Sequence, residues 1–274
     1  GSPGNSSSYL PSLSSDGRFV AFVSEARTLV AGDTNAMRDI FVRDLQAGVT
    51  VRASVDSTGH QGDGGCYRPA LSADGRRVAF ESDADNLVRG DANGRADIFV
   101  HELQTGATVR ASVDSAGIEG DGLSQHPSIS GDGRFVAFES PSTHLVAGDT
   151  NGVSDVFVHD LQTGRTARVS LDSAGSQATS ASTDPSLSAD GRLVAFACAS
   201  PLVPGDTNGM GDVFVRDLRT GRLTRVSTDS SGGEADGASS TPAFSPDARF
   251  VELRVTLAAR AIAHATRARS PISS

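Results

Sequence analysis

Four copies of one short acidic segment carry the residues with the clearest chemical potential in this sequence. The copies begin at Asp33, Asp91, Asp149 and Asp206, so they recur after 58, 58 and 57 residues. The third copy, residues 148–155, reads Gly-Asp-Thr-Asn-Gly-Val-Ser-Asp. Counted from the first Asp, an Asn stands at position 3 and a second Asp at position 7. Carboxylate and amide oxygens are the ligand atoms that Ca²⁺ prefers in proteins.

Two interpretations of the segment stay open. Calcium binding would use side-chain oxygens at positions 1, 3 and 7 and only the backbone carbonyl at position 5, where the residue type varies. Turn chemistry is the alternative, because Asp and Asn side chains form Asx-turns and Asn-Gly is a turn dipeptide. Ala36 replaces the turn Gly in the first copy, so strain is expected there. The candidate ligands are Asp33, Asn35, Asp39, Asp91, Asn93, Asp97, Asp149, Asn151, Asp155, Asp206, Asn208 and Asp212.

Motifs of catalysis are missing from the sequence. It has no Gly-x-Ser-x-Gly elbow, no phosphate-binding loop and no His-Glu-x-x-His segment. The His residues show no ligand spacing, and acids that occur in four copies do not resemble one catalytic centre. We therefore expect a non-enzymatic protein.

The acidic segments belong to a larger repeat that covers residues 11–251. Complete copies occupy residues 11–68, 69–126, 127–184 and 185–241, and a partial fifth copy occupies 242–251. Residues 1–10 are expected to be a flexible lead-in, and residues 252–274 form a divergent tail. A tandem repeat of this length predicts a repeat architecture in which each copy is one supersecondary unit.

Each complete copy predicts four short strands. A Pro-Ser-Leu-Ser strand (residues 11–14) and an Arg-Phe-Val-Ala-Phe strand (18–22) flank an Asp-Gly dipeptide that suits a tight hairpin. The acidic segment follows, and then a strand at residues 39–42 that is apolar on both faces and should be buried. The fourth strand, around residues 50–55, alternates, so we expect its Thr50, Arg52 and Ser54 face to be exposed at an outer edge. The acid that follows the third strand, Asp44 in the first copy, is expected to organise the next turn.

Four antiparallel strands per unit, repeated in tandem, are typical of the blades of a β-propeller. We therefore predict an all-β fold, a β-propeller of four complete four-stranded blades of about 58 residues plus a partial fifth. The motifs Pro-Ser-Leu-Ser-x-Asp-Gly-Arg-x-Val-Ala-Phe-x-Ser and Asp-Ile/Val-Phe-Val-x-Asp-Leu-x-Thr-Gly resemble the WD40-like (PD40) repeat of TolB-type propellers. The resemblance implies a periplasmic or secreted protein. The acidic segments also resemble the calcium loops of other propellers, such as integrin α-subunits.

Composition limits the class of partner. The formal net charge of −9 disfavours nucleic acid, and no apolar run is long enough to cross a membrane. We expect a binding or scaffold module with a protein partner, and a second copy of the chain is one way to complete the propeller. Two alternatives stay open, which are the propeller domain of a larger hydrolase or peptidase and a carbohydrate-binding propeller. Aromatic content of 5% without Trp disfavours the carbohydrate alternative.

Overall fold

The fold consists of five antiparallel sheets that follow one another along the chain. The computed structural model describes residues 4–256 and 266–271, and within these residues all regular structure is β-strand. Each of the first four sheets has four strands in the order of the sequence, and the fifth sheet has three. We call these five sheets blades 1 to 5. The strands are β1 (Ser8–Leu13), β2 (Phe19–Ser24), β3 (Asp39–Asp44) and β4 (Val49–Arg52) in blade 1; β5 (Cys66–Leu71), β6 (Arg77–Ser82), β7 (Asp97–Glu102) and β8 (Thr108–Arg110) in blade 2; β9 (Gln125–Ile129), β10 (Phe135–Ser140), β11 (Asp155–Asp160) and β12 (Arg165–Arg168) in blade 3; β13 (Ser182–Leu187), β14 (Leu193–Cys198), β15 (Asp212–Asp217) and β16 (Leu223–Arg225) in blade 4; and β17 (Ala238–Phe244), β18 (Phe250–Thr256) and β19 (Thr266–Pro271) in blade 5.

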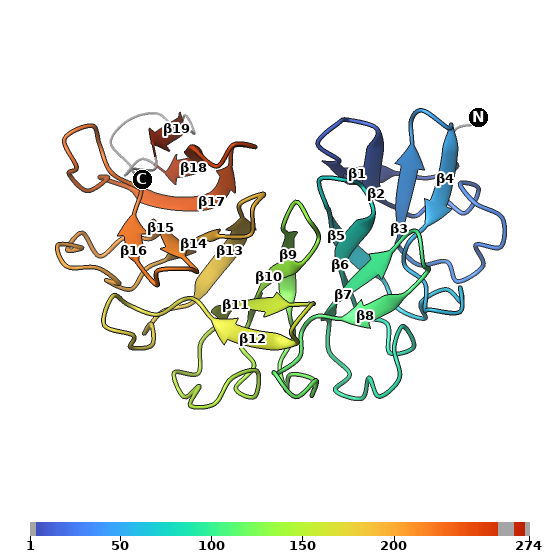
Figure 1. The fold of residues 1–274 in the computed structure, drawn as a ribbon, viewed down its shortest axis with the longest axis horizontal. Coiled ribbons are helices and arrows are strands. Elements are labelled where there is room, and N and C mark those ends of the chain that lie inside the picture. Colours follow the sequence, from blue (N-terminus) through green and yellow to red (C-terminus); the bar gives the residue numbers. More distant parts are fainter. Residues whose placement is uncertain (1–3, 257–265, 272–274) are drawn as a thin grey trace.

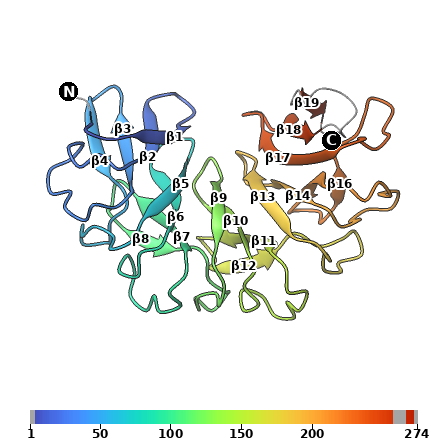
Figure 2. The ribbon, with the colours of Figure 1, turned by 180° about the vertical axis from the view of Figure 1, so that it is seen from behind.

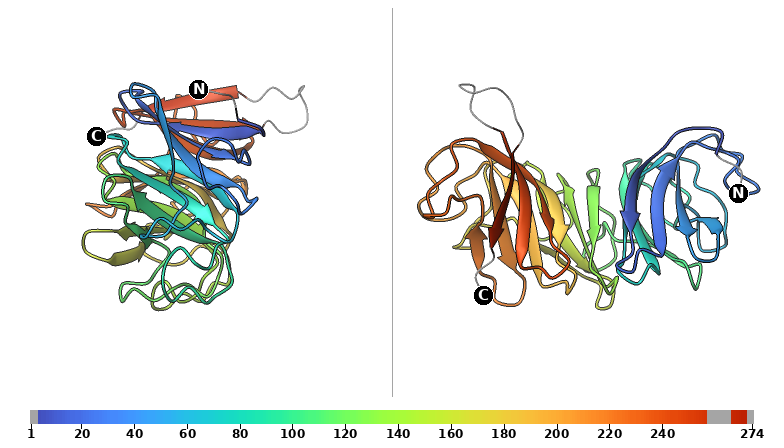
Figure 3. Two further views of the ribbon diagram at one scale, coloured as in Figure 1. Left: turned by 90° about the vertical axis from the view of Figure 1, so that its right-hand side faces the viewer. Right: turned by 90° about the horizontal axis from the view of Figure 1, so that it is seen from above.

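The blades are arranged in an arc around a common axis, with the first strand of each blade on the inside (Figure 1). Blades 1 and 5 stand at the two ends of the arc, and an opening separates them (Figures 1 and 2). The same opening is seen from above in Figure 3. This is the predicted all-β propeller architecture, and the ring of blades is not closed. No helix in the described residues is long and apolar enough to cross a membrane.

The innermost strand of every blade is longer than the sequence predicted. β1 begins at Ser8, inside the segment that was expected to be a flexible lead-in, and the inner strands of the other blades also begin before their Pro. A β-bulge causes the difference. In blade 1, Tyr9 pairs with Val23, Ser12 pairs with Ala21, and the two residues between them are out of register. Pro11 has no N–H to donate, and a bulge is one of the few places where a sheet accepts such a residue.

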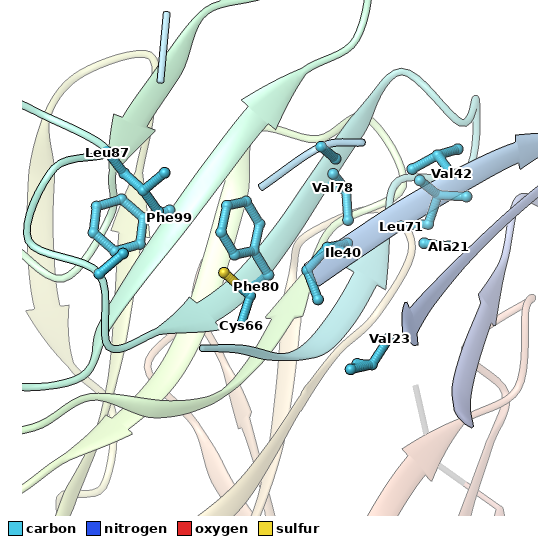
Figure 4. Packing of buried hydrophobic residues seen from close by; sticks show 12 residues of the cluster. Ala21, Val23, Ile40, Val42, Cys66, Leu71, Val78, Phe80, Leu87 and Phe99 are labelled. Carbon is cyan, nitrogen blue, oxygen red and sulfur yellow. The ribbon is translucent and has the colours of Figure 1, made fainter. Parts of the chain in front are cut away.

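Neighbouring blades pack through two different faces. One face of blade 1 carries small and β-branched residues, including Ala21, Val23 and Val42, and it contacts a face of blade 2 that carries larger residues, including Val78 and Phe80 (Figure 4). All five of these side chains are at most 2% exposed. The same arrangement joins blade 2 to blade 3, blade 3 to blade 4 and blade 4 to blade 5. We call the two faces the small face and the large face.

Blade 5 extends beyond the segment predicted for the fifth repeat. That segment was expected to end at residue 251, whereas β18 continues to Thr256 and pairs with β19 from Phe250↔Pro271 to Val255↔Thr266. The core positions Val251 and Leu253 of β18 are 0% and 3% exposed. The divergent tail therefore begins inside a strand that keeps the repeat's packing pattern on the face that contacts blade 4.

Candidate functional site

The four acidic segments occupy equivalent places in blades 1 to 4. Each lies in the loop between the second and third strands of its blade, and its second Asp is the first residue of the third strand. In blade 2 this brings the carboxylates of Asp91 and Asp97 together with that of Glu119, with ligand atoms within 4.8 Å of one another. We call each set a loop cluster. The structure therefore brings together the first and seventh positions of the segment.

An arginine from the fourth strand lies inside each loop cluster. In blade 2, Nη1 of Arg110 is 3.1 Å from Asp91 Oδ1, 3.3 Å from Asp97 Oδ2 and 2.7 Å from Glu119 Oε2. The side chains of Arg110, Asp91 and Asp97 are 8%, 1% and 0% exposed, so the pairs are withdrawn from solvent. Arg52, Arg168 and Arg225 hold the same place in the other blades. The cation that the structure places among these carboxylates is thus a guanidinium.

The fourth strand is therefore oriented differently from the sequence expectation. Arg52 and Ser54 were expected on an exposed face, but the Arg52 side chain is only 10% exposed and Ser54 is fully buried. Instead, Val49 and Val51 are 53% and 43% exposed. The expectation was wrong because the polar side chains of this strand have partners in the acidic loop, whereas alternation alone cannot distinguish a buried polar partner from solvent.

The second Asp of each segment has a fixed hydrogen-bond partner. Asp155 Oδ1 accepts a hydrogen bond from Ser170 Oγ at 2.5 Å, and Ser170 Oγ in turn accepts the N–H of Val156 at 3.0 Å. The same Ser-to-Asp hydrogen bond occurs in the other three blades. Burial raises the pKa of Asp39 and of Asp97, while these Ser hydroxyls oppose the rise. The buried carboxylate is therefore held in place by the strand next to it.

The Asn at position 3 makes the turn that its residue type favours. Asn93 Oδ1 accepts the N–H of Arg95 at 2.8 Å, and Asn93 Nδ2 donates to the carbonyl of Gly120 at 3.0 Å. Asn35, Asn151 and Asn208 repeat both contacts. Each Asn thus ties its own loop to the loop that leads into the next blade. In the first copy Ala36 adopts a φ of 63°, which a Gly adopts in the other three copies.

A fourth polar residue completes each cluster, and the sequence reasoning missed it. Blades 2 and 4 supply Glu119 and Glu234, whereas blades 1 and 3 supply Gln61 and Gln177 at the same place. Burial raises the pKa of Asp91 to about 6 against the opposing effect of Arg110, and the carboxylates of Asp97 and Glu119 add to the rise. The sequence signal was the recurrence of Gln or Glu at one position of the loop that joins the fourth strand of a blade to the next blade.

A second polar set lies at the axis of the propeller, where the blades differ from one another. The residue before the Pro of each inner strand lines a depression of about 300 Å³ that all five blades share. These residues all have positive φ values, from 48° to 53°, because each forms the bulge of its strand. Their types nevertheless vary completely, and they are Leu10, Arg68, His126, Asp184 and Thr241. We call this depression the axial mouth.

Two buried glutamates from the second strands support the axial residues. Glu139 Oε1 lies 2.9 Å from Nδ1 of His126, and Glu139 Oε2 accepts the backbone N–H of Asp184 at 2.7 Å. Glu81 Oε2 lies 3.7 Å from Nε of Arg68, and Glu81 Oε1 accepts a hydrogen bond from Gln125 at 3.3 Å. Glu81 and Glu139 are 6% and 8% exposed. The hydrogen bond to Glu139 and the negative charge of that carboxylate raise the pKa of His126.

Sequence reasoning missed the axial set, although a signal was present. Strands β6 and β10 read Val-Ala-Phe-Glu-Ser, with a Glu in an otherwise apolar strand, where blades 1 and 4 have Val23 and Ala197. A charged residue at a buried position needs a partner, so it marks a site. The residue before the Pro differs in every repeat, so it is not part of the repeated pattern.

Comparison with known proteins supports the fold. No protein-family model and no curated protein sequence matches the chain. Among solved structures, TolB from Acinetobacter baumannii is similar at a TM-score of 0.51 and 22% identity, over 92% of this chain and 52% of that one. A protein from Agrobacterium tumefaciens assigned as TolB has a TM-score of 0.57 and 18% identity, over 93% and 72%. The β-propeller domain of the Trilobed protease from Pyrococcus furiosus, described as having an open velcro topology, has a TM-score of 0.57 and 10% identity, over 97% and 69%. The fold is therefore a TolB-like β-propeller, and this chain spans about half the length of the first of these structures.

Proposed function

We propose that this chain is a non-enzymatic, extracytoplasmic binding module whose protein partner packs against the open end of blade 1. One observation carries the proposal. The large face of a blade is covered by the preceding blade in blades 2 to 5, whereas in blade 1 the same face is open. Leu13 on this face is 57% exposed, while its counterparts Leu71, Ile129 and Leu187 are 8%, 9% and 7% exposed.

The open face of blade 1 keeps the apolar residues of an interface. Val20 and Phe22 are half-buried, whereas the corresponding Val78 and Phe80 of blade 2 are 0% exposed. Contiguous apolar surface of this kind on a soluble protein marks an interaction site. Its chemistry suits another apolar sheet surface, because each covered large face in the molecule contacts one.

We take a second copy of the chain as the partner, paired through the same face. Head-to-tail pairing is disfavoured by blade 5, where Glu252 and Arg254 occupy the places that Ala21 and Val23 hold on the small face of blade 1. Two-fold pairing of blade 1 with blade 1 places apolar residues against apolar residues, and two-fold dimers are the commonest oligomers.

Light scattering after size-exclusion chromatography tests this proposal. We expect the wild-type chain to have the mass of a dimer and Leu13→Asp to have the mass of a monomer. Ile118→Asp is the matched control, because Ile118 is also exposed, at 62%, but lies in a loop of blade 2. A wild-type monomer at all concentrations, or a Leu13→Asp variant that still dimerises, would overturn the pairing. Circular dichroism verifies that each variant is folded.

Calcium binding forms a second part of the proposal, and we assign it to the loop clusters of blades 2 and 4. In each of these, three carboxylates and one guanidinium leave two negative charges uncompensated, whereas the Gln of blades 1 and 3 leaves one. Oδ2 of Asp91 and of Asp212 is buried without a hydrogen-bond partner, but so are Oδ1 of Asp33 and Oδ2 of Asp39 in blade 1, so the excess charge is what distinguishes blades 2 and 4. Carboxylate oxygens suit Ca²⁺, and the ion would balance the excess charge.

Calorimetric titration with Ca²⁺ tests this assignment. The double variant Glu119→Gln, Glu234→Gln converts both clusters to the composition that blades 1 and 3 already use, so it should fold and lose calcium affinity. Calcium at a hundredfold excess over Kd should stabilise the wild type by about 2.7 kcal/mol per site. Equal melting temperatures in EDTA and in calcium would contradict the assignment.

The alternative function is that of a propeller domain within a larger hydrolase or peptidase. The similarity to the propeller domain of the Trilobed protease supports it. The distinguishing measurement is the sequence of the native gene, in which a Gly-x-Ser-x-Gly segment on the same chain would favour the peptidase. Fractionation of cells that express the native gene tests the periplasmic or secreted location.

A further inference from the structure

The axial mouth gathers one imidazole and two carboxylates at a single point. Ligand atoms of His126, Glu139 and Asp184 all lie within 4.8 Å of one another, and they come from three strands of two adjacent blades. Nitrogen and oxygen donors in this combination suit Zn²⁺, which commonly takes His and carboxylate ligands. We propose that the axial mouth is a binding site for one Zn²⁺ ion, held by His126, Glu139 and Asp184.

The charge of the axial mouth favours a divalent cation. Glu81, Glu139 and Asp184 contribute three negative charges there, and Arg68 is the one permanently charged cation among the residues that line the depression. Arg68 compensates one of these three carboxylate charges. A Zn²⁺ ion balances the other two carboxylate charges.

A buried oxygen next to this set has an ion-pair partner but no hydrogen bond. Glu81 is 6% exposed, yet its Oε2 accepts no hydrogen bond, and the nearest cationic atom is Arg68 Nε at 3.7 Å. Glu81 is linked to the set through Gln125, the residue before His126. A buried carboxylate with incomplete hydrogen bonding adds to the negative potential at the axial mouth.

Blades 2 and 3 provide an internal comparison. In blade 2 the axial residue is Arg68, whose guanidinium faces Glu81 and supplies a permanent positive charge. In blade 3 the axial residue is His126, which faces Glu139 at the same register position. An imidazole can give a lone pair to a metal, whereas a guanidinium cannot. Blade 3 is thus built like blade 2, with a metal-binding side chain in place of a fixed cation.

The position of the ion determines what it can do. Two of the three proposed ligands, His126 and Asp184, line the depression of about 300 Å³. Zn²⁺ with three protein ligands keeps a fourth position open for water or a ligand. Because two of the ligands line the axial mouth, we assign the fourth position to a ligand that enters there, a carboxylate or another anionic oxygen group.

Calorimetric titration of the full chain with Zn²⁺ tests the site, in buffer that contains excess Ca²⁺ to occupy the loop clusters. We expect one Zn²⁺ per chain in the wild type. His126→Arg copies the Arg68–Glu81 pair of blade 2, including its positive φ, so it should fold and lose the site. Glu139→Gln removes a charged direct ligand, so it should weaken binding by at least the ~10-fold that loss of an outer-shell partner costs.

His144→Arg is the matched control, because His144 is 69% exposed and lies 3.8 Å from Asp121 in a surface loop. It should bind Zn²⁺ like the wild type. Absence of Zn²⁺ binding in the wild type, or unchanged binding in a folded His126→Arg variant, would overturn the proposal. This result is independent of dimerisation, since the open face of blade 1 has no part in the site.

Discussion

Replacement of Arg110 by Met tests whether a guanidinium holds the two long loops of a blade together. The side chain of Met is also long and unbranched, so the variant removes the charge and keeps most of the volume. Arg110 contacts three carboxylates through one nitrogen, and the side chains of Asp91 and Asp97 are almost fully buried. The variant leaves these buried charges without a cation.

The expected loss of stability follows from this geometry. Removing one partner from a buried ion pair costs about 3–5 kcal/mol, because the remaining charge is buried and uncompensated. With a urea m-value of about 3 kcal/mol/M, the loss lowers the unfolding midpoint by about 1–1.7 M. Arg52→Met should cost less, because Gln61 is neutral and Nη1 of Arg52 is 3.5 Å from each of its two carboxylates.

Urea unfolding followed by circular dichroism, in EDTA so that calcium cannot replace the lost cation, measures both variants. The double variant Arg110→Met, Glu119→Gln provides the control, because it removes one of the three unpaired carboxylates and should recover part of the loss. A change of less than about 1 kcal/mol for Arg110→Met, the size typical of an exposed ion pair, would refute the reasoning. An equal loss for Arg52→Met and Arg110→Met would show that the third carboxylate does not matter.

Three further predictions follow from local features. Ala36→Gly should stabilise the protein by about 1 kcal/mol, measured as a higher urea midpoint, since Ala36 has a φ of 63° and a left-handed conformation is unfavourable for Ala; a lower midpoint would contradict this. Arg192 lowers the pKa of Asp217 to about 2, so the stabilisation from this pair is complete above the ordinary pKa of 3.8 and is lost as the pH falls through about 2; the melting temperature should therefore drop less steeply in Asp217→Asn over that range. Burial raises the pKa of the Cys66 thiol to about 12, so Cys66 should resist a disulfide reagent at pH 8 until the protein unfolds, and rapid labelling of the native protein would count against this.

The sequence predicted the architecture well because the architecture is repeated. Strands that are apolar on both faces, such as residues 39–42, were expected to be buried, and Ile40 and Phe41 are fully buried. Asp44 was expected to organise the turn after its strand, and it accepts the N–H groups of Gln46 and Ala47. Such contacts are local, so residue type and spacing determine them.

Non-local contacts were beyond the reach of the same reasoning. Arg52 belongs to a strand that looks half-exposed in isolation, and its acidic partners come from a different loop. The pairing of His126 with Glu139 is also non-local, because it depends on the bulge that turns the residue before the Pro toward the axis. Period-2 alternation states which residues share a face and leaves open what that face contacts.

Repetition itself separates the structural residues from the candidate functional ones. The arginine of the loop cluster occurs in all four complete blades, and its contacts tie together loops of the same blade, so its primary role is to stabilise each blade. The axial residue, by contrast, is of a different type in each of the five blades, and all five residues line the same depression. A ring of repeated units brings one residue from every blade to its axis, where differences between the repeats can combine into one asymmetric site. The repeats are therefore similar in the residues that pack one blade against the next and different in the residue that each blade places at the axis. Arg68, His126 and Asp184 are the charged or titratable residues among these axial positions.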